Sequence, residues 1–287
     1  MLGKLIKHDF RSTGKVMVPL HLVLVGVTIL GSLLVGSKLL QRMELLPLTV
    51  TLVIAYILMI IAFSTVVSIF LIVNFYRNMF SSQGYLTFTL PASPWSLLHS
   101  KSIVGLVWVL VNNILTYGSM ILLMCSAAGF SNVASMLRDI TDMSIYADGG
   151  MTVSIGIQDL LGYTLPQLLL LLTFITLVSC FYNVATGYGS VAIGQLHAKH
   201  KVLGTVAAYL VIRFITQIVM SVVMLFFSLR PLIGMTTSPN IETEDLATLM
   251  RGIYHPMFII LIVVFLAIGI GCYVAAGIIM NKNVNLD

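Results

Sequence analysis

The sequence predicts an all-α, polytopic membrane protein with six transmembrane helices and both termini in the cytoplasm. Of its 287 residues, 59% are hydrophobic and only 9% are charged, and the mean hydropathy is +1.04. Soluble domains carry roughly 25% charged residues, so this chain has too few charges to cover a water-soluble globule. Helices are expected because a spanning helix satisfies its backbone hydrogen bonds internally.

Six apolar runs are long enough to cross about 30 Å of hydrocarbon. They cover residues 16–36, 47–74, 102–128, 161–193, 202–229 and 257–280. Residues 16–287 are therefore expected to form one transmembrane domain. Residues 129–160 contain several aspartates, and we expect a solvated acidic loop there on the outer side.

Residues 1–15 are predicted to form a separate amphipathic helix that lies in the cytoplasmic membrane interface. On a helical wheel the apolar side holds Leu2, Leu5, Ile6 and Phe10, and the opposite side holds Lys4, Lys7, Arg11 and Lys15. Asp9 falls near the apolar side and interrupts the pattern. The segment either anchors the chain to lipid phosphates or contacts a partner, and the sequence leaves both open.

The orientation follows from the distribution of charge. The N-terminus, residues 75–101, residues 194–201 and the C-terminus together hold nine basic and two acidic side chains. The remaining connections hold five basic and eight acidic side chains. An excess of Lys and Arg marks the cytoplasmic side, so both termini are predicted to lie inside. This bias also accounts for the pI near 9.1 without a nucleic-acid partner.

The motifs of common enzymes are missing from the sequence. It contains no GxxxxGK[ST] phosphate loop, HExxH, GxSxG or CxxC motif, and its six histidines are scattered. We therefore expect no catalytic residues, no metal site and no cofactor in this chain.

One basic residue lies deep in a predicted span. Arg213 is about 12 residues beyond Lys201, which places it near the middle of the membrane, and Thr216 and Gln217 follow one turn later. Arg213 and Gln217 either line a translocation pathway or form structural hydrogen bonds between helices. The sequence does not decide between these two interpretations.

The connection after the second span is unusual in composition. Residues 78–96 carry no formal charge but contain four aromatic side chains, Phe80, Tyr85, Phe88 and Trp95. Exposed aromatic residues with little charge to desolvate are typical of a docking surface. The alternative is an aromatic belt at the level of the lipid headgroups.

Three cytoplasmic segments resemble one known family. The stretch "YRNMFSSQGYLTFTLPASPWSLLHSK", the start "MLGKLIKHDFRSTGK" and the connection "IGQLHAKHKVLG" are similar to segments of ABC-2 type ABC-transporter permeases of Gram-positive bacteria. With the six-helix layout, the resemblance touches most of the chain. It favours the docking interpretation of the aromatic connection.

The resemblance implies a permease subunit of an ATP-driven exporter in the bacterial plasma membrane. In such permeases a coupling helix docks into a separate ATPase subunit, which would hold the ATP and Mg²⁺, and a second permease, identical or related, completes the pathway. The cargo would be an antimicrobial peptide, a drug or a lipid-like molecule. The implied ATPase contacts are Asn78, Met79, Phe80, Gly84, Tyr85, Phe88 and Leu90, with Gln195, His197, Lys199 and Lys201 as a smaller second zone.

A stand-alone membrane protein is the alternative, either a secondary transporter or a scaffold without an ATPase partner. A secondary transporter ordinarily places acidic residues inside the membrane for ion coupling, and no predicted span carries one in its core. A scaffold would be recognised by the lack of a stably bound ATPase.

Overall fold

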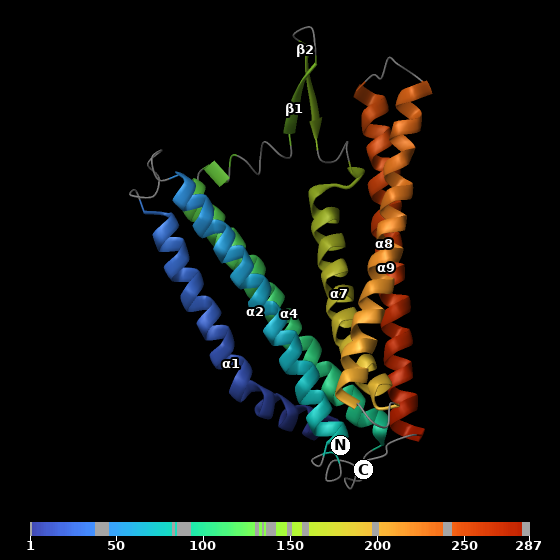
Figure 1. Ribbon diagram of the computed structural model, residues 1–287. Helices are drawn as coiled ribbons and strands as arrows, with labels where there is room; N and C mark the ends of the chain where they lie inside the picture. The colour runs from blue at the N-terminus through green and yellow to red at the C-terminus, as the bar shows by residue number, and fades with distance from the viewer. Residues whose placement is uncertain are drawn as a thin grey trace. The chain divides into compact units, whose positions relative to one another are not determined.

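The computed structural model describes residues 2–37, 46–81, 84, 93–129, 132, 133, 135, 142–147, 151–156, 161–196, 201–237 and 243–282. Its long helices are α1 (Leu2–Val35), α2 (Leu46–Phe80), α4 (Pro94–Ala128), α7 (Leu165–Gly194), α8 (Lys201–Thr237) and α9 (Thr243–Lys282) (Figure 1). Among the described residues, these six helices are long and apolar enough to cross a membrane, which confirms the six predicted spans.

The N-terminal segment differs from the sequence prediction in one respect. Residues 2–15 do not form a helix of their own, because α1 runs without interruption from Leu2 to Val35 and includes the first span. Pro19 lies inside this helix. A proline there removes one backbone hydrogen bond and favours a bend, and the ribbon of α1 is bent along its length (Figure 1).

The all-α description needs one correction. Strands β1 (Asp142–Ala147) and β2 (Met151–Gly156) pair as an antiparallel hairpin within the segment expected to be a solvated loop. Asp142 pairs with Gly156 at one end of the register, and Ala147 pairs with Met151 at the other. Ile, Val, Tyr and Thr occur in these strands, and the intervening sequence DGG is typical of a tight hairpin turn.

The chain divides into two compact units, which we describe separately. Unit 1 contains residues 1–133, 180–210 and 269–287, and unit 2 contains residues 134–179 and 211–268. Unit 1 thus holds all of α1, α2 and α4 with the end of α7, the start of α8 and the end of α9. Unit 2 holds the hairpin and the remaining parts of α7, α8 and α9.

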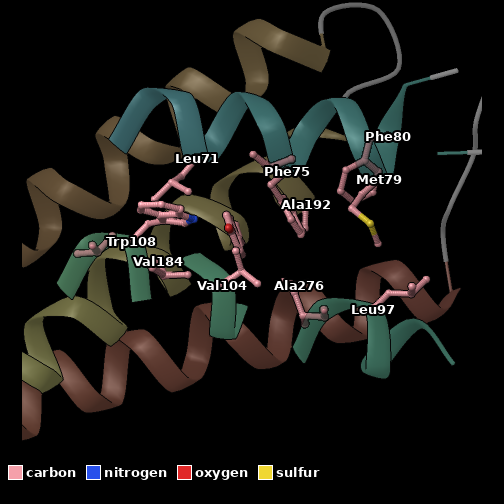
Figure 2. Close-up of a cluster of buried hydrophobic side chains, with 14 of the residues drawn as sticks. Leu71, Phe75, Met79, Phe80, Leu97, Val104, Trp108, Val184, Ala192 and Ala276 are labelled. Carbon is pink, nitrogen blue, oxygen red and sulfur yellow. The ribbon is translucent and has the colours of Figure 1, made fainter. Parts of the chain in front are cut away.

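The core of unit 1 is made of large apolar side chains from several helices. Phe75 of α2 stacks on Tyr188 of α7, with ring centroids 4.0 Å apart. Trp108 and Val104 of α4 belong to the same buried cluster (Figure 2). Many apolar side chains on the outer surfaces stay exposed, among them Leu30 of α1 at 63%. In a membrane these outer surfaces face lipid, whose tails are as apolar as the side chains.

Helix ends gather at one end of unit 1. The first turns of α1 contact the first turns of α4 through Asp9 and Lys101. Trp95, at the start of α4, packs on Gly277 near the end of α9. Gly194, which ends α7, lies against Thr205 near the start of α8. The chain segments that join these helix ends therefore enter and leave unit 1 at this same end.

Candidate functional site

The candidate site is the place where the aromatic connection leaves α2 and enters α4. Six buried side chains of the hydrophobic core of unit 1 lie at the nearby ends of α2, α4 and α9, and we call this group the base cluster. It consists of Met79 and Phe80 of α2, Leu97 and Leu98 of α4, and Ala276 and Met280 of α9. Figure 2 shows Met79 and Phe80 on the last turn of α2, with Leu97 and Ala276 nearby.

Local sequence explains why α4 begins where it does. Ser93 is the N-cap, its side chain accepts a hydrogen bond from the backbone N–H of Ser96 at 3.2 Å, and Pro94 takes the first helical position. Both choices are favourable at a helix start, because the cap satisfies a free N–H and proline has none to lose. One turn of helix then brings Leu97 and Leu98 into the base cluster.

Trp95 fixes the start of α4 on α9. A methyl group added at Gly277 would overlap the indole ring of Trp95, so only glycine permits this approach. Tyr273, one turn earlier on α9, lies 6.4 Å from Trp95 between ring centroids. The return from the aromatic connection is therefore held against α9 by ring packing.

The predicted contact residues fall into different environments. Asn78 is half-buried, and its side-chain amide donates to the side-chain oxygen of Asn74 at 3.1 Å. Gly84 is buried, and its backbone N–H donates to the carbonyl oxygen of Ser81 at 2.7 Å. Tyr85, Phe88 and Leu90 lie outside the described residues.

Met79 and Phe80 differ from the expectation of exposed docking residues. Met79 is 0% exposed and Phe80 is 6% exposed, and both belong to the core of unit 1. Phe80 is aromatic, and its neighbours in residues 78–96 carry no charge. This local composition is compatible with a core position as well as with a docking surface. Both side chains belong to the buried cluster that also contains Leu97 and Leu98, so they tie the end of α2 to the start of α4.

The smaller second zone is only partly described. Gln195 is half-buried, and its side chain donates to the backbone oxygen of Val191 at 3.4 Å. Lys201 is the half-buried first residue of α8. His197 and Lys199 lie outside the described residues.

The site contains a buried ion pair that the sequence analysis did not identify. Asp9 is 7% exposed, and its carboxylate lies 2.5 Å from the ammonium nitrogen of Lys101. Ser100 donates a second hydrogen bond to this carboxylate at 2.7 Å. The sequence did carry a signal, since Asp9 falls on the apolar side of the wheel, and a buried carboxylate needs a partner.

A second polar contact continues along the same two helices. The indole N–H of Trp108 donates to the hydroxyl oxygen of Thr13 at 2.9 Å, one turn beyond Asp9 on α1. Phe10 stacks on the Trp108 ring with centroids 5.0 Å apart. The N-terminal segment is therefore fastened to α4 by an ion pair, a hydrogen bond and a ring stack.

Arg213, Thr216 and Gln217 lie in the part of α8 that belongs to unit 2. Arg213 is half-buried and Gln217 is exposed. Thr216 is buried between them, and its hydroxyl donates to the backbone oxygen of Ile212 at 2.8 Å. The hydroxyl of Thr216 is thus used within its own helix, and a pathway role for Arg213 and Gln217 stays a prediction.

No protein-family model, curated protein or solved structure matches this chain.

Proposed function

We propose that the chain is the transmembrane permease subunit of an ATP-driven ABC exporter. It forms half of a translocation pathway and couples to a separate ATPase subunit, which holds the ATP and Mg²⁺. The resemblance of the three cytoplasmic segments suggests this function. The observation that carries it is the base cluster, which joins the last turn of α2, the start of α4 and the end of α9 in one buried core.

The base cluster suits a coupling role because a close-packed group transmits displacement. Protein cores have the density of organic crystals and yield little to local compression. A partner that pushes on residues 81–93 acts on a connection whose two ends are held by Phe80 and Leu97. The ends of α2, α4 and α9 then move together, since all three contribute to the cluster.

The proposed orientation places the packed end of unit 1 in the cytoplasm. The connections at this end are the ones rich in Lys and Arg, which the positive-inside rule assigns to the cytoplasm. Both chain termini then lie inside, and the β1–β2 hairpin lies outside. The membrane is the plasma membrane of a bacterial cell, as the resemblance suggests.

A second permease completes the pathway, either another copy of this chain or a related protein. The surface by which this chain contacts lipid and the second permease includes the exposed apolar side chains of α8, for example Phe214 and Leu225. Cargo of this class is an antimicrobial peptide, a drug or a lipid-like molecule.

Co-purification tests the proposal. The tagged chain is extracted from its native membrane in a gentle detergent, and bound proteins are identified by mass spectrometry. We expect a P-loop ATPase in stoichiometric amount, lost in Tyr85→Ala and Phe88→Ala and retained in the control Leu30→Ala, whose side chain is exposed within α1. Absence of any ATPase, even after mild cross-linking in the membrane, would favour the stand-alone alternative.

A further inference from the structure

The first turns of α1 present a row of basic side chains. Lys4, Lys7, Arg11 and Lys15 are all exposed, and we call these four residues the basic stripe. In a helix of about 3.6 residues per turn, their spacing places them within an arc of about 80°. At about 1.5 Å per residue the stripe extends about 16 Å along the helix. The four charges therefore form one continuous positive surface.

The opposite side of these turns is used by the protein itself. Asp9 is buried and pairs with Lys101 of α4. Leu5 and Ile6 pack against the core of unit 1. An amphipathic helix that lies free in the membrane interface buries its apolar side among acyl chains. In this protein unit 1 covers most of that side, and the basic stripe faces away from unit 1.

Unit 1 offers the stripe no anion among its described residues. Asp9 is the only acidic residue in that part of the chain. Its carboxylate already binds the ammonium group of Lys101 and the hydroxyl of Ser100, and the exposed ring of His8 lies 3.9 Å from it. It also lies on the side of the helix opposite to the stripe. Counter-ions for the four charges therefore come from outside the described part of unit 1.

The stripe ends where the first apolar run begins. Lys15 is followed directly by residues 16–36, which are long enough to cross the hydrocarbon of a bilayer. Long basic side chains at the end of a span reach the lipid headgroups. Pro19 lies just beyond the stripe, and the ribbon of α1 bends, so that the turns with the stripe run obliquely to the rest of the helix (Figure 1). An oblique course keeps the stripe nearer the headgroups than a straight helix would.

Contacts with α4 fix the direction in which the stripe faces. Asp9 pairs with Lys101 on one turn. One turn later Thr13 accepts a hydrogen bond from the indole N–H of Trp108 at 2.9 Å. Phe10 stacks on the same indole with ring centroids 5.0 Å apart. These contacts prevent rotation of the helix, so binding to the stripe requires little further ordering of the backbone.

We propose that the basic stripe is a docking surface for anionic phospholipids, whose headgroup phosphates line up beside its four side chains. Each lysine meets a phosphate as a point charge, and Arg11 can donate two parallel hydrogen bonds to one phosphate. Each basic residue near an anionic membrane surface adds to the attraction. The ammonium group of a zwitterionic lipid cancels the charge of its phosphate, so the stripe selects lipids with a net negative charge.

The proposal requires a chain that spans a membrane but neither an ATPase nor a second permease. It therefore stands independently of the proposed function. An acidic surface of a partner protein is the competing occupant. The lipid is favoured because the stripe adjoins a span, and lipid headgroups surround every spanning helix where it leaves the hydrocarbon.

Native mass spectrometry of the purified full chain tests the lipid preference. The chain in detergent is incubated with equal amounts of phosphatidylglycerol and phosphatidylcholine that carry the same acyl chains, and the bound lipids are counted. We expect phosphatidylglycerol to be retained preferentially. In Lys7→Gln with Arg11→Gln this preference should fall on the order of tenfold, because two of the four cations are lost. The matched control, Arg77→Gln with Lys282→Gln, removes two exposed charges outside the stripe and should keep the preference.

Three results would overturn the proposal. Equal retention of the two lipids by the unaltered chain would mean that the protein does not select anionic lipid. An equal fall in preference in the stripe variant and in the control variant would attribute lipid binding to net charge alone. Loss of a co-purifying protein in the stripe variant, with the lipid preference unchanged, would assign the stripe to a protein partner.

A folding control accompanies each variant. Protection of the buried thiols Cys180 and Cys272 from a thiol reagent verifies that the chain is folded in detergent. If the first stripe variant fails this criterion, Lys4→Gln with Lys15→Gln replaces it, since both side chains are exposed at the ends of the stripe. An unchanged preference in that second variant contradicts the proposal.

Discussion

Removal of Lys101 should destabilise the protein far more than removal of an exposed lysine. Lys101→Met keeps the apolar stem and deletes the charge, which leaves the carboxylate of Asp9 buried with the hydroxyl of Ser100 as a hydrogen-bond donor and the exposed ring of His8 at 3.9 Å. The side chains of Lys101 and Asp9 are only 12% and 9% exposed. Breaking a buried ion pair on one side costs about 3–5 kcal/mol, whereas an exposed pair contributes roughly 0–1 kcal/mol.

The assay is thermal unfolding in detergent, followed with a thiol-reactive fluorescent dye. The dye reaches Cys180 and Cys272 on unfolding, because both thiols are buried in the folded chain. A loss of 3–5 kcal/mol corresponds to a decrease in Tm on the order of 10 °C for a chain of this size. Lys15→Met is the matched control, since Lys15 is exposed on α1, and its Tm should stay within about 2 °C of the wild type.

The double variant separates the ion pair from the packing of Lys101. In Asp9→Asn with Lys101→Met no buried charge is left, so most of the lost stability should return. Equal Tm values for Lys101→Met and Lys15→Met would refute the reasoning, because they would mean that the Asp9 carboxylate is solvated. Failure of the double variant to recover would attribute the loss to packing instead.

Three further predictions concern packing and docking. Gly277→Ala should lower the Tm measured by dye binding, because the added methyl overlaps Trp95, whereas Gly271→Ala on the same helix meets nothing within 4 Å and should leave the Tm unchanged. An equal change in Tm for the two variants would contradict the close packing of Trp95 on Gly277. Trp108→Phe loses the hydrogen bond to Thr13, so the free energy of unfolding in a denaturant titration should fall by about 1 kcal/mol. An unchanged free energy of unfolding would mean that this hydrogen bond makes no net contribution to stability. Phe80→Ala should cost about 3–5 kcal/mol in the same titration because the side chain is buried, whereas Tyr85→Ala should remove the ATPase in a pull-down without such a loss. Loss of the ATPase in Phe80→Ala without loss of stability, and retention of the ATPase in Tyr85→Ala, would place the docking surface at Phe80.

Sequence predicted the helices well because membrane spans depend on length and apolar composition alone. Each of the six runs overlaps its own long helix, although the fourth run begins at residue 161 and α7 begins at Leu165. The helix ends were harder to place. Residues 2–15 extend the first span as one helix, because amphipathicity describes a helical face but not where a helix stops.

The details of packing could not be obtained from one-dimensional patterns. Asp9 interrupts the apolar side of the wheel, but only the fold brings Lys101 to it from 92 residues away. Phe80 has the composition of an exposed docking residue and the environment of a core residue. The hairpin escaped prediction because its two strands are short and lie among acidic residues, although the sequence DGG between them is a recognisable turn signal.

The central claim is that the connection between α2 and α4 receives an ATPase in the cytoplasm. The most direct measurement introduces a photo-cross-linking residue at position 85 or 88 in cells, with position 30 as a control in the exposed lipid-facing surface of α1. Our account predicts that a P-loop ATPase is captured from positions 85 and 88 and is not captured from position 30. Capture of no ATPase from either position, in membranes where the chain is folded and inserted, would contradict the account and support a stand-alone membrane protein.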